Sequence, residues 1–237
     1  MIEKSFLQQY ATKSQTTFKN IAREYVQHLF LSNFYQLKKS DCLFFKGGTA
    51  LRLIFRSPRF SEDIDLTASC DSNIFENLFQ ETLIMIEKEG LTTGLIESKQ
   101  TTGGHLAIIE TRVYDEKLKI KIEASQRKKK AIQGEKTTIA SDIFPSYTLQ
   151  NLAQPLLISE KIDALLTRHK SRDFFDLYYI LRARLGTEVV VDQRAKILKL
   201  IEKTKDGFAD LKQFLPKNFW PIIKELRKNL TKELNML

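Results

Sequence analysis

KGGTALR (46–52) and RFSEDIDL (59–66) are the two segments that decide this fold. An apolar run at 42–45 precedes the glycines and apolar residues at helical spacing follow them, which predicts a strand-to-helix turn at Gly47 and Gly48. Backbone N–H groups at a helix start, with the positive end of the helix dipole behind them, hold phosphate, and glycine lets the anion approach closely. Thr49 adds a hydroxyl to this predicted phosphate-binding turn.

Two carboxylates follow in the second segment. Side chains alternate between faces in an extended chain, so Asp63 and Asp65 project together on one side while Ile64 and Leu66 enter the core. Two adjacent carboxylates repel unless a hard cation such as Mg²⁺ satisfies both and bridges to substrate phosphates. A solvated strand end is the bland interpretation of Asp-x-Asp alone, and the Gly-Gly turn just before it favours a metal-binding pair.

Together the two segments resemble a known signature. A Gly-Gly turn, a helix and a strand bearing Asp63 and Asp65 resemble the signature of the polymerase-β-like nucleotidyltransferases. The complete sequence of both segments is similar, more narrowly, to the AbiEii/AbiGii nucleotidyltransferase toxins, which include the mycobacterial MenT proteins. The resemblance implies an α/β (α+β) core with a mixed sheet. It also implies nucleotide binding by the turn residues Gly47, Gly48, Thr49 and Arg52. Neither a Walker A motif nor a dinucleotide-binding fingerprint occurs.

Composition sets the broad class. The 237 residues are 42% hydrophobic and 28% charged, which is typical of one or two compact domains. A net charge of +9 favours a polyanionic partner. No apolar run reaches the roughly 20 residues of a membrane helix and the N-terminus lacks a secretory signal, so we expect a cytoplasmic protein. Cys42 and Cys70 are expected to be ordinary buried thiols.

Apolar periodicity predicts the remaining elements of the core. Helices are expected within 5–39 and 71–90, and strands at 91–98, 105–114 and 117–124. The last of these alternates strictly and carries Glu123 as the only acid on a face of three lysines. Two interpretations of Glu123 stay open: the third carboxylate that the nucleotidyltransferase fold places on a neighbouring strand, or a cross-strand partner of a basic residue.

A basic segment and a change of pattern follow. Arg127, Lys128, Lys129 and Lys130 are expected to form a loop that is either simply solvated or holds a nucleic-acid backbone. Beyond it, Pro145 and Pro155 bracket an extended connection. We therefore predict a nucleotidyltransferase core with N-terminal helices at 1–150 and a helical C-terminal region at 151–237.

A second group of charged residues lies on two predicted helices, 159–168 and 171–181. Taken alone, Lys161 suits an exposed helix face and Asp173 suits a helix N-terminus. The pattern Glu-Lys-Ile-x-Ala-x-x-x-Arg followed by Arg-Asp-x-x-Asp-Leu, however, resembles the remaining two motifs of the AbiEii-type toxins. The resemblance implies that Lys161 holds nucleotide phosphates and that Asp173 positions this lysine or assists deprotonation of the acceptor. The expected supporting ion-pair shell is Arg168, Arg172 and Asp176.

The sequence thus predicts an enzyme that transfers a nucleotide and releases pyrophosphate. Mg²⁺ (or Mn²⁺) held by Asp63, Asp65 and Glu123 would activate the attacking oxygen and neutralise the leaving group. The family resemblance implies a tRNA 3′ end as acceptor and a cognate antitoxin as partner. Alternatives are a small-molecule or protein acceptor, or a non-catalytic nucleic-acid-binding module built on the basic loop.

Overall fold

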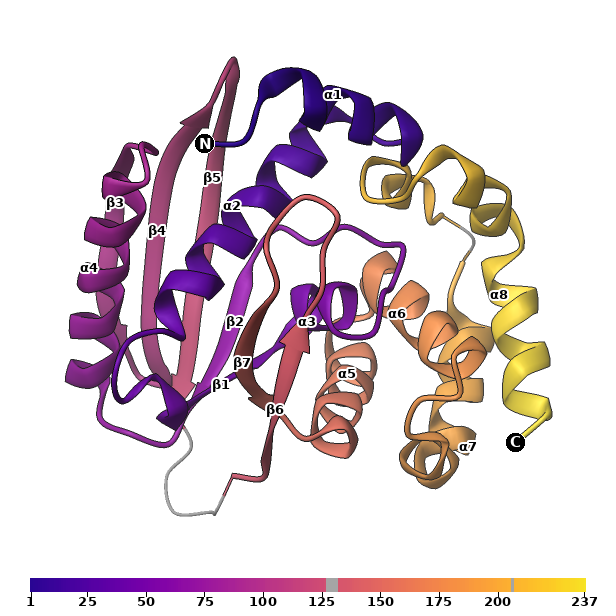
Figure 1. Cartoon of the computed structure of the whole chain (residues 1–237). Helices are drawn as coiled ribbons and strands as arrows, with labels where there is room; N and C mark the ends of the chain where they lie inside the picture. Colours follow the sequence, from indigo (N-terminus) through magenta and orange to yellow (C-terminus); the bar gives the residue numbers. More distant parts are fainter. Residues whose placement is uncertain (127–131, 206) are drawn as a thin grey trace. The chain divides into compact units, whose positions relative to one another are not determined.

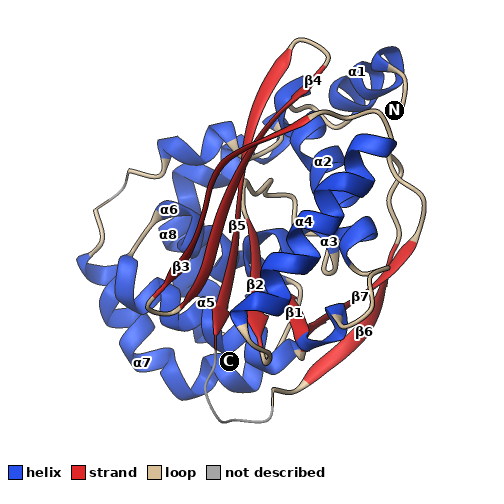
Figure 2. Ribbon diagram, turned by 90° about the vertical axis from the view of Figure 1, so that its left-hand side faces the viewer, coloured by secondary structure: helices blue, strands red, loops and turns tan. Residues whose placement is uncertain are grey.

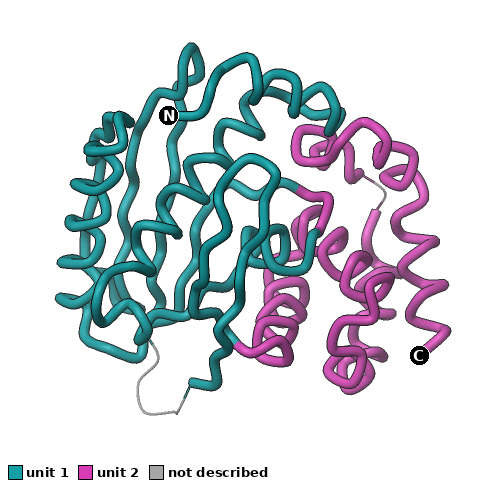
Figure 3. Tube along the Cα trace, in the orientation of Figure 1, with its two compact units in different colours: residues 1–56, 60–152 teal, residues 57–59, 153–237 magenta. Residues whose placement is uncertain are grey.

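The computed structural model describes residues 1–126, 132–205 and 207–237. It divides into two compact units (Figure 3): unit 1 is Met1–Arg56 with Phe60–Leu152, and unit 2 is Ala153–Leu237 with the short segment Ser57–Arg59. Unit 1 is a mixed α/β domain and unit 2 is helical. The predicted α/β class is therefore confirmed. No helix in the described part of the chain is long and apolar enough to cross a membrane.

Unit 1 contains a seven-stranded sheet and four α-helices among its described residues (Figure 1). The helices are α1 (Lys4–Lys13), α2 (Phe18–Phe34), α3 (Gly47–Leu53) and α4 (Ser72–Lys88), with a short 3₁₀ turn η1 at Ser40–Cys42. The strands are β1 (Leu43–Lys46), β2 (Ile64–Ala68), β3 (Thr93–Thr101), β4 (Gly104–Val113), β5 (Glu116–Gln126), β6 (Gly134–Ile139) and β7 (Tyr147–Leu152).

The sheet is mixed, as predicted, and its strand order is β3-β4-β5-β2-β1-β7-β6 (Figure 2). The short strands β1 and β2 lie at its centre and pair antiparallel with each other. Each also has a parallel neighbour, β7 beside β1 and β5 beside β2. The alternation read in 117–124 is realised in β5, where Leu118, Ile120 and Ile122 are fully buried. This arrangement sets the residues of β1, β2 and β5 side by side.

Helices α2 and α4 pack against each other and contact strands of the sheet. Thr17 caps α2 by accepting a hydrogen bond from the backbone N–H of Asn20. The phenyl rings along these helices stack in pairs, Phe30 on Phe34 at 5.6 Å and Phe75 on Phe79 at 6.0 Å between ring centroids. The aromatic residues of this region therefore form core contacts, the commoner expectation for apolar residues at helical spacing.

The hairpin β6–β7 was not predicted as strands. The β6 segment, GEKTTI, is mostly exposed and has no apolar alternation, because it lies at the edge of the sheet. Only its last residue, Ile139, is buried. An edge strand with polar residues on both faces gives no period-2 signal in the sequence. By contrast, the predicted strands at 91–98, 105–114 and 117–124 are confirmed as β3, β4 and β5 within a few residues.

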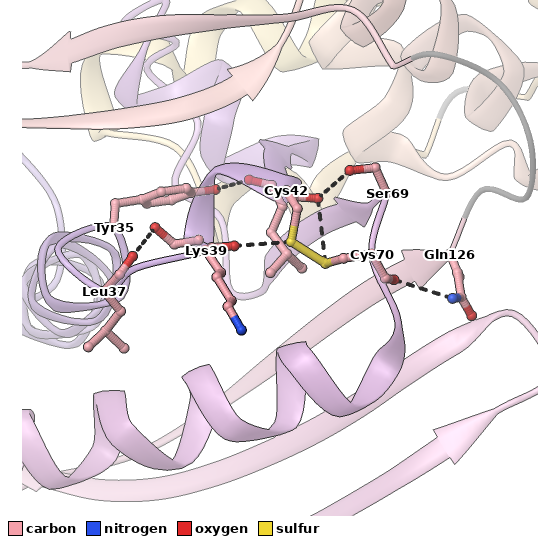
Figure 4. Close-up of a disulfide and its surroundings, with 9 residues drawn as sticks. Tyr35, Leu37, Lys39, Cys42, Ser69, Cys70 and Gln126 are labelled. Carbon is pink, nitrogen blue, oxygen red and sulfur yellow. Dashed lines mark hydrogen bonds between the residues drawn. A yellow bond between two sulfur atoms is a disulfide. The ribbon is translucent and has the colours of Figure 1, made fainter.

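Cys42 and Cys70 form a disulfide (Figure 4), so the expectation of two ordinary buried thiols was wrong. Cys42 lies just before β1 and Cys70 lies just after β2. The antiparallel register pairs Leu43 with Ala68, which brings these two strand ends together. The Cα atoms of the cysteines are 5.8 Å apart, within the range that a disulfide spans. The bond joins the ends of the two strands that carry the predicted site.

Unit 2 is built from four α-helices and two 3₁₀ turns in the described residues: α5 (Gln154–Arg168), α6 (Ser171–Arg182), α7 (Thr187–Lys203), η2 (Ala209–Gln213), η3 (Lys217–Phe219) and α8 (Trp220–Asn235). Helix α5 begins five residues before the predicted start, with Pro155 in its first turn, where the missing N–H has no helical partner to lose. Helix α6 packs on α5 and α8, and α7 also contacts both.

Candidate active site

The glycine turn lies at the junction of β1 and α3 and presses against a predicted metal-binding residue. Gly47 has φ of +83°, in the left-handed region that favours glycine. A Cβ atom at this position would lie 2.1 Å from Oδ2 of Asp65, far inside contact distance. Both the backbone conformation and the space therefore require glycine here. The turn and the Asp65 carboxylate are in direct contact.

The hydroxyl of Thr49, which was expected to contact phosphate, is bonded to the protein backbone. The side chain is fully buried, and its hydroxyl donates to the backbone carbonyl of Asp63. This bond ties α3 to the residue that precedes β2, and so fixes the carboxylate segment relative to the turn. Because the hydroxyl is used in this bond, nucleotide binding by the Thr49 side chain stays a prediction.

The carboxylates share one face of the central strands. Asp65 of β2 is the register partner of Glu123 on the parallel strand β5, and Asp63 lies two residues from Asp65. Lys121 contacts two of these carboxylates: its Nζ is 3.6 Å from an oxygen of Asp63 and 3.1 Å from an oxygen of Glu123. Burial alone would lower the pKa of Lys121, but Asp63 and Glu123 raise it. The ammonium of Lys121 thus acts as the counter-charge of this face.

The carboxylate face suits a hard divalent cation in its chemistry. Its donors are carboxylate oxygens on adjacent strands, and it already accommodates a cationic group between Asp63 and Glu123. Within 1–126, 132–205 and 207–237, no three Asp, Glu, His or Cys side chains form a metal-binding cluster. The assignment of a metal to Asp63, Asp65 and Glu123 therefore stays a prediction. The lysine that Glu123 contacts, Lys121, lies on the same strand β5, so the alternative of a cross-strand basic partner also stays a prediction.

Lys46 is a second basic residue of this region that sequence reasoning quoted but did not assign. It is the register partner of Asp65 across β1 and β2, which places the two side chains on the same face. Its ammonium donates to the hydroxyl of Ser125 at 2.7 Å, and Ser125 donates to the carbonyl of Leu66 at 3.1 Å. The strand alternation that singled out Glu123 also contains Lys121, so that signal was available for one of the two lysines.

Arg52 of α3 is held by Glu24 and Phe60. Its Nε donates to Glu24 of α2 at 2.6 Å, and its guanidinium lies 3.9 Å from the centre of the Phe60 ring. These contacts join α2, α3 and the segment before β2. A hollow of about 270 Å³ lies beside Arg52 and is also lined by Glu24 and His28. A role of Arg52 in nucleotide binding stays a prediction.

In unit 2 a buried carboxylate holds two basic groups. Asp176 of α6 accepts two hydrogen bonds from Arg59, at 2.7 and 2.8 Å, and one from Lys161 of α5 at 2.8 Å. Asp176 and Arg59 are 1% and 3% exposed. Burial alone would raise the pKa of Asp176, but the charges and hydrogen bonds of Arg59 and Lys161 outweigh it and lower the pKa to about 2. The carboxylate is therefore ionised at neutral pH.

Asp173 has a separate partner. Its carboxylate accepts from Nε and a terminal nitrogen of Arg168, at 2.9 and 2.7 Å. Asp176, one turn further along α6, and not Asp173, accepts the hydrogen bond from Lys161. The other expected role of Asp173, assisting deprotonation of the acceptor, stays a prediction. Of the expected supporting residues, Arg168 and Asp176 form ion pairs, while the buried Nε of Arg172 has no hydrogen-bond partner in the described part of the chain. Arg59 was quoted in the motif without a role.

The predicted basic loop, Arg127, Lys128, Lys129 and Lys130, lies outside the described residues. Its assignment to nucleic-acid binding stays a prediction.

A family model described as "Nucleotidyl transferase AbiEii toxin, Type IV TA system" matches residues 29–236 of the chain. No curated protein sequence matches this chain. Among solved structures, the nucleotidyltransferase toxin MenT4 of Mycobacterium tuberculosis is similar, with a TM-score of 0.66 and 16% identity over 100% of this chain and 91% of that one. JHP933 of Helicobacter pylori gives a TM-score of 0.60 and 19% identity over 93% and 92% of the two chains. At these identities the two structures support the fold.

Proposed function

The chain belongs to the AbiEii family of nucleotidyltransferase toxins of type IV toxin–antitoxin systems, and on that premise we propose that it transfers a nucleoside monophosphate from a nucleoside triphosphate to a tRNA 3′ end. The acceptor hydroxyl loses its proton to solvent as its oxygen bonds to the α-phosphorus, the bond from that phosphorus to the oxygen of the β-phosphate breaks, and pyrophosphate leaves. The family is one of enzymes, which argues against a non-catalytic nucleic-acid-binding module. Its toxin–antitoxin context also implies a cognate antitoxin as partner.

The contact between Gly47 and Asp65 carries this proposal. A turn whose N–H groups suit a phosphate lies against a carboxylate that suits a metal, with 2.1 Å between the place of a Cβ atom and Oδ2. A metal–triphosphate substrate needs these two features at the same place. Thr49 keeps them in register through its bond to the carbonyl of Asp63.

Each residue of the carboxylate face then has a task. Asp63, Asp65 and Glu123 would hold Mg²⁺ (or Mn²⁺), which when bound would polarise the α-phosphate and neutralise the leaving pyrophosphate. Lys121 would move toward solvent, which its 37% exposed side chain permits. We further propose that Lys161 contacts nucleotide phosphate. Since nucleoside triphosphates and tRNA are cytoplasmic, the activity would reside in the cytoplasm.

The test uses each of the four α-labelled nucleoside triphosphates with Mg²⁺, total cell RNA and the purified protein. We expect label from at least one nucleotide to enter the tRNA band and to resist removal by a protease. Asp65→Asn is the matched inactive variant, because it keeps the side-chain shape and removes the charge. Label in protein or in small molecules instead of RNA would refute the tRNA acceptor while leaving the transferase activity intact.

A second test addresses Lys161. Removing a fixed charge beside a transferring phosphoryl group costs on the order of 10²-fold or more in rate. We therefore expect Lys161→Ala to lose transfer to that extent at every RNA concentration. Lys170→Ala is the control, because Lys170 is an exposed residue just before α6. Recovery of the wild-type rate at saturating RNA would show that Lys161 binds RNA and does not contact the reacting nucleotide.

A further inference from the structure

A hollow in unit 2 combines one tryptophan with several lysines. It has a volume of about 870 Å³ and lies between the segment 207–217 and the start of α8. Trp220 and the exposed residues Lys212, Lys217 and Lys224 line it. We call this hollow, with its lining residues, the Trp220 groove. Its volume is in the range of small-molecule and nucleotide sites, and the sequence motifs described above do not include it.

The Trp220 ring is held in place and already accepts a cation. Its Nε1 donates to the carbonyl of Leu215 at 3.1 Å, so the indole has a fixed orientation. The ammonium of Lys212 lies 5.4 Å from the centre of the ring. Phe208, a buried lining residue, packs its ring on Phe174 of α6 at 5.3 Å between ring centroids, which ties the lining to the core of unit 2. A fixed, partly exposed indole is a surface on which a planar group can stack.

The charge around the ring is positive. Lys212, Lys217 and Lys224 face a single acid, Glu225, among the groove's lining residues. The three lysines come from three separate elements, η2, η3 and α8, and all three line the hollow that Trp220 lines. The N-terminal end of α8 also begins at Trp220 and adds a partial positive charge. A ligand that places one planar group on Trp220 and several negative charges around it fits this arrangement.

Single-stranded nucleic acid is the ligand with that chemistry, because each base has a flat face and each linkage carries one negative charge. We propose that the Trp220 groove binds a single-stranded segment of RNA, with one base stacked on Trp220 and neighbouring phosphates on the three lysines. The identification of this RNA as the acceptor of nucleotide transfer rests on the proposed function. The binding itself does not.

Trp220 makes the proposal directly measurable, because it is the only tryptophan of the chain. Stacking a base on the indole quenches its fluorescence, so a titration with an oligoribonucleotide of about ten residues, without nucleoside triphosphate or Mg²⁺, reports on this groove alone. With three phosphate contacts, the single-strand salt slope is about −2, which is a loss of roughly 20-fold in affinity between 50 and 200 mM salt. Lys224→Ala should reduce that loss to about 7-fold.

Two matched variants complete the test. Lys232→Ala removes a lysine of α8 that lies about 12 Å along the helix from Lys224 and does not line the groove. This variant should leave the quenching and the salt dependence unchanged. Trp220→Leu should bind labelled RNA at least about 10-fold more weakly by anisotropy, and Trp220→Phe should keep most of the affinity because it keeps a ring.

The ligand arms separate the alternatives. A mononucleotide should quench much more weakly than the oligomer, and polyglutamate, a polyanion without bases, should not quench. Equal binding of the mononucleotide would make this a nucleotide site, and equal quenching by polyglutamate would make it a surface for an acidic protein. Either result, or no quenching by RNA, would overturn the proposal. Because no transfer is measured, these outcomes are independent of whether the RNA labelling assay succeeds.

Discussion

Replacing Asp176 by Asn should destabilise unit 2 more than any other single change in its charged residues. The substitution keeps the shape of the side chain but removes the negative charge between Arg59 and Lys161. Two basic groups then face each other, with Arg59 only 3% exposed. The amide also brings N–H donors toward groups that are themselves donors. The loss is therefore that of a counter-charge and of hydrogen bonds together.

The magnitude follows from two independent arguments. The pKa of Asp176 falls from its ordinary value of 3.8 to about 2, which corresponds to about 2 kcal/mol of stabilisation of the charged form. Removing one partner of a buried ion pair costs about 3–5 kcal/mol, because the remaining charge is left uncompensated. We expect the larger value for Asp176→Asn, since a protonated carboxyl keeps two oxygen atoms with acceptor capacity, whereas the amide keeps one and replaces the other by an NH₂ donor.

Urea unfolding followed by Trp220 fluorescence measures this loss, because the single tryptophan reports on unit 2. Asp163→Asn is the control: Asp163 is an exposed acid on α5, two residues from Lys161, and should change stability by less than about 0.5 kcal/mol. A loss below about 1 kcal/mol for Asp176→Asn, with an unchanged slope against urea, would refute the reasoning that this carboxylate holds Arg59 and Lys161.

Acid provides a second measurement of the same group. The folded-state pKa of Asp176 lies below its unfolded value, so the unfolded chain binds more protons between about pH 4 and pH 2. The contribution of Asp176 is complete above about pH 4 and disappears as the pH falls toward 2. The wild-type protein should therefore lose stability over this window more steeply than Asp176→Asn. Equal slopes would contradict the assignment of a depressed pKa.

Three further predictions concern unit 1. Gly47→Ala should lower transfer by about 10²-fold and stability by about 1–3 kcal/mol, because its Cβ atom would collide with Asp65; an RNA labelling assay and urea unfolding measure the two effects. Cys42→Ser removes the disulfide to Cys70, 28 positions away, so it should lower the free energy of unfolding by about 3–4 kcal/mol relative to the oxidised protein. Relative to the wild type reduced by dithiothreitol, urea unfolding should show no loss. Burial lowers the pKa of His28 to about 4; the unfolded state then binds the extra proton below pH 6.5, and about 3 kcal/mol should be lost between pH 6.5 and 4 in the wild type but not in His28→Asn.

The glycine turn and Asp65 were predictable because their signal is local. A strand-to-helix turn at Gly47 and a carboxylate on an alternating strand each follow from residues within about 20 positions, and the structure places them in contact. The disulfide was not predictable from cysteine content, since it depends on the register that sets Leu43 beside Ala68. Edge strand β6 has no apolar pattern because it has little to bury.

The choice between Asp173 and Asp176 shows a different limit. The two residues lie three positions apart on α6 and share a helix face, so spacing alone allows either to reach Lys161. The choice is made by Arg59, 117 positions before Asp176, and by Arg168, five positions before Asp173. A helical pattern identifies the face on which charges gather, and only the three-dimensional structure assigns each acid to its base.

The two charged clusters differ in how readily their ion pairs can be exchanged. Lys121 is 37% exposed and its partner Glu123 is 49% exposed, so water can replace each contact as it breaks and the cost is small. Asp176 and Arg59 are 1% and 3% exposed, and separating them would leave bare charges in the interior. The proposed metal–nucleotide complex would therefore displace only a weak lysine contact at the carboxylate face and would gain carboxylate ligands there. The Asp176 cluster has no comparable exchange available, because its ion pairs are buried, and it holds Lys161 through one of them. Exchangeable charge thus lies on the face proposed to bind metal, and permanent charge lies where a basic side chain must be held still.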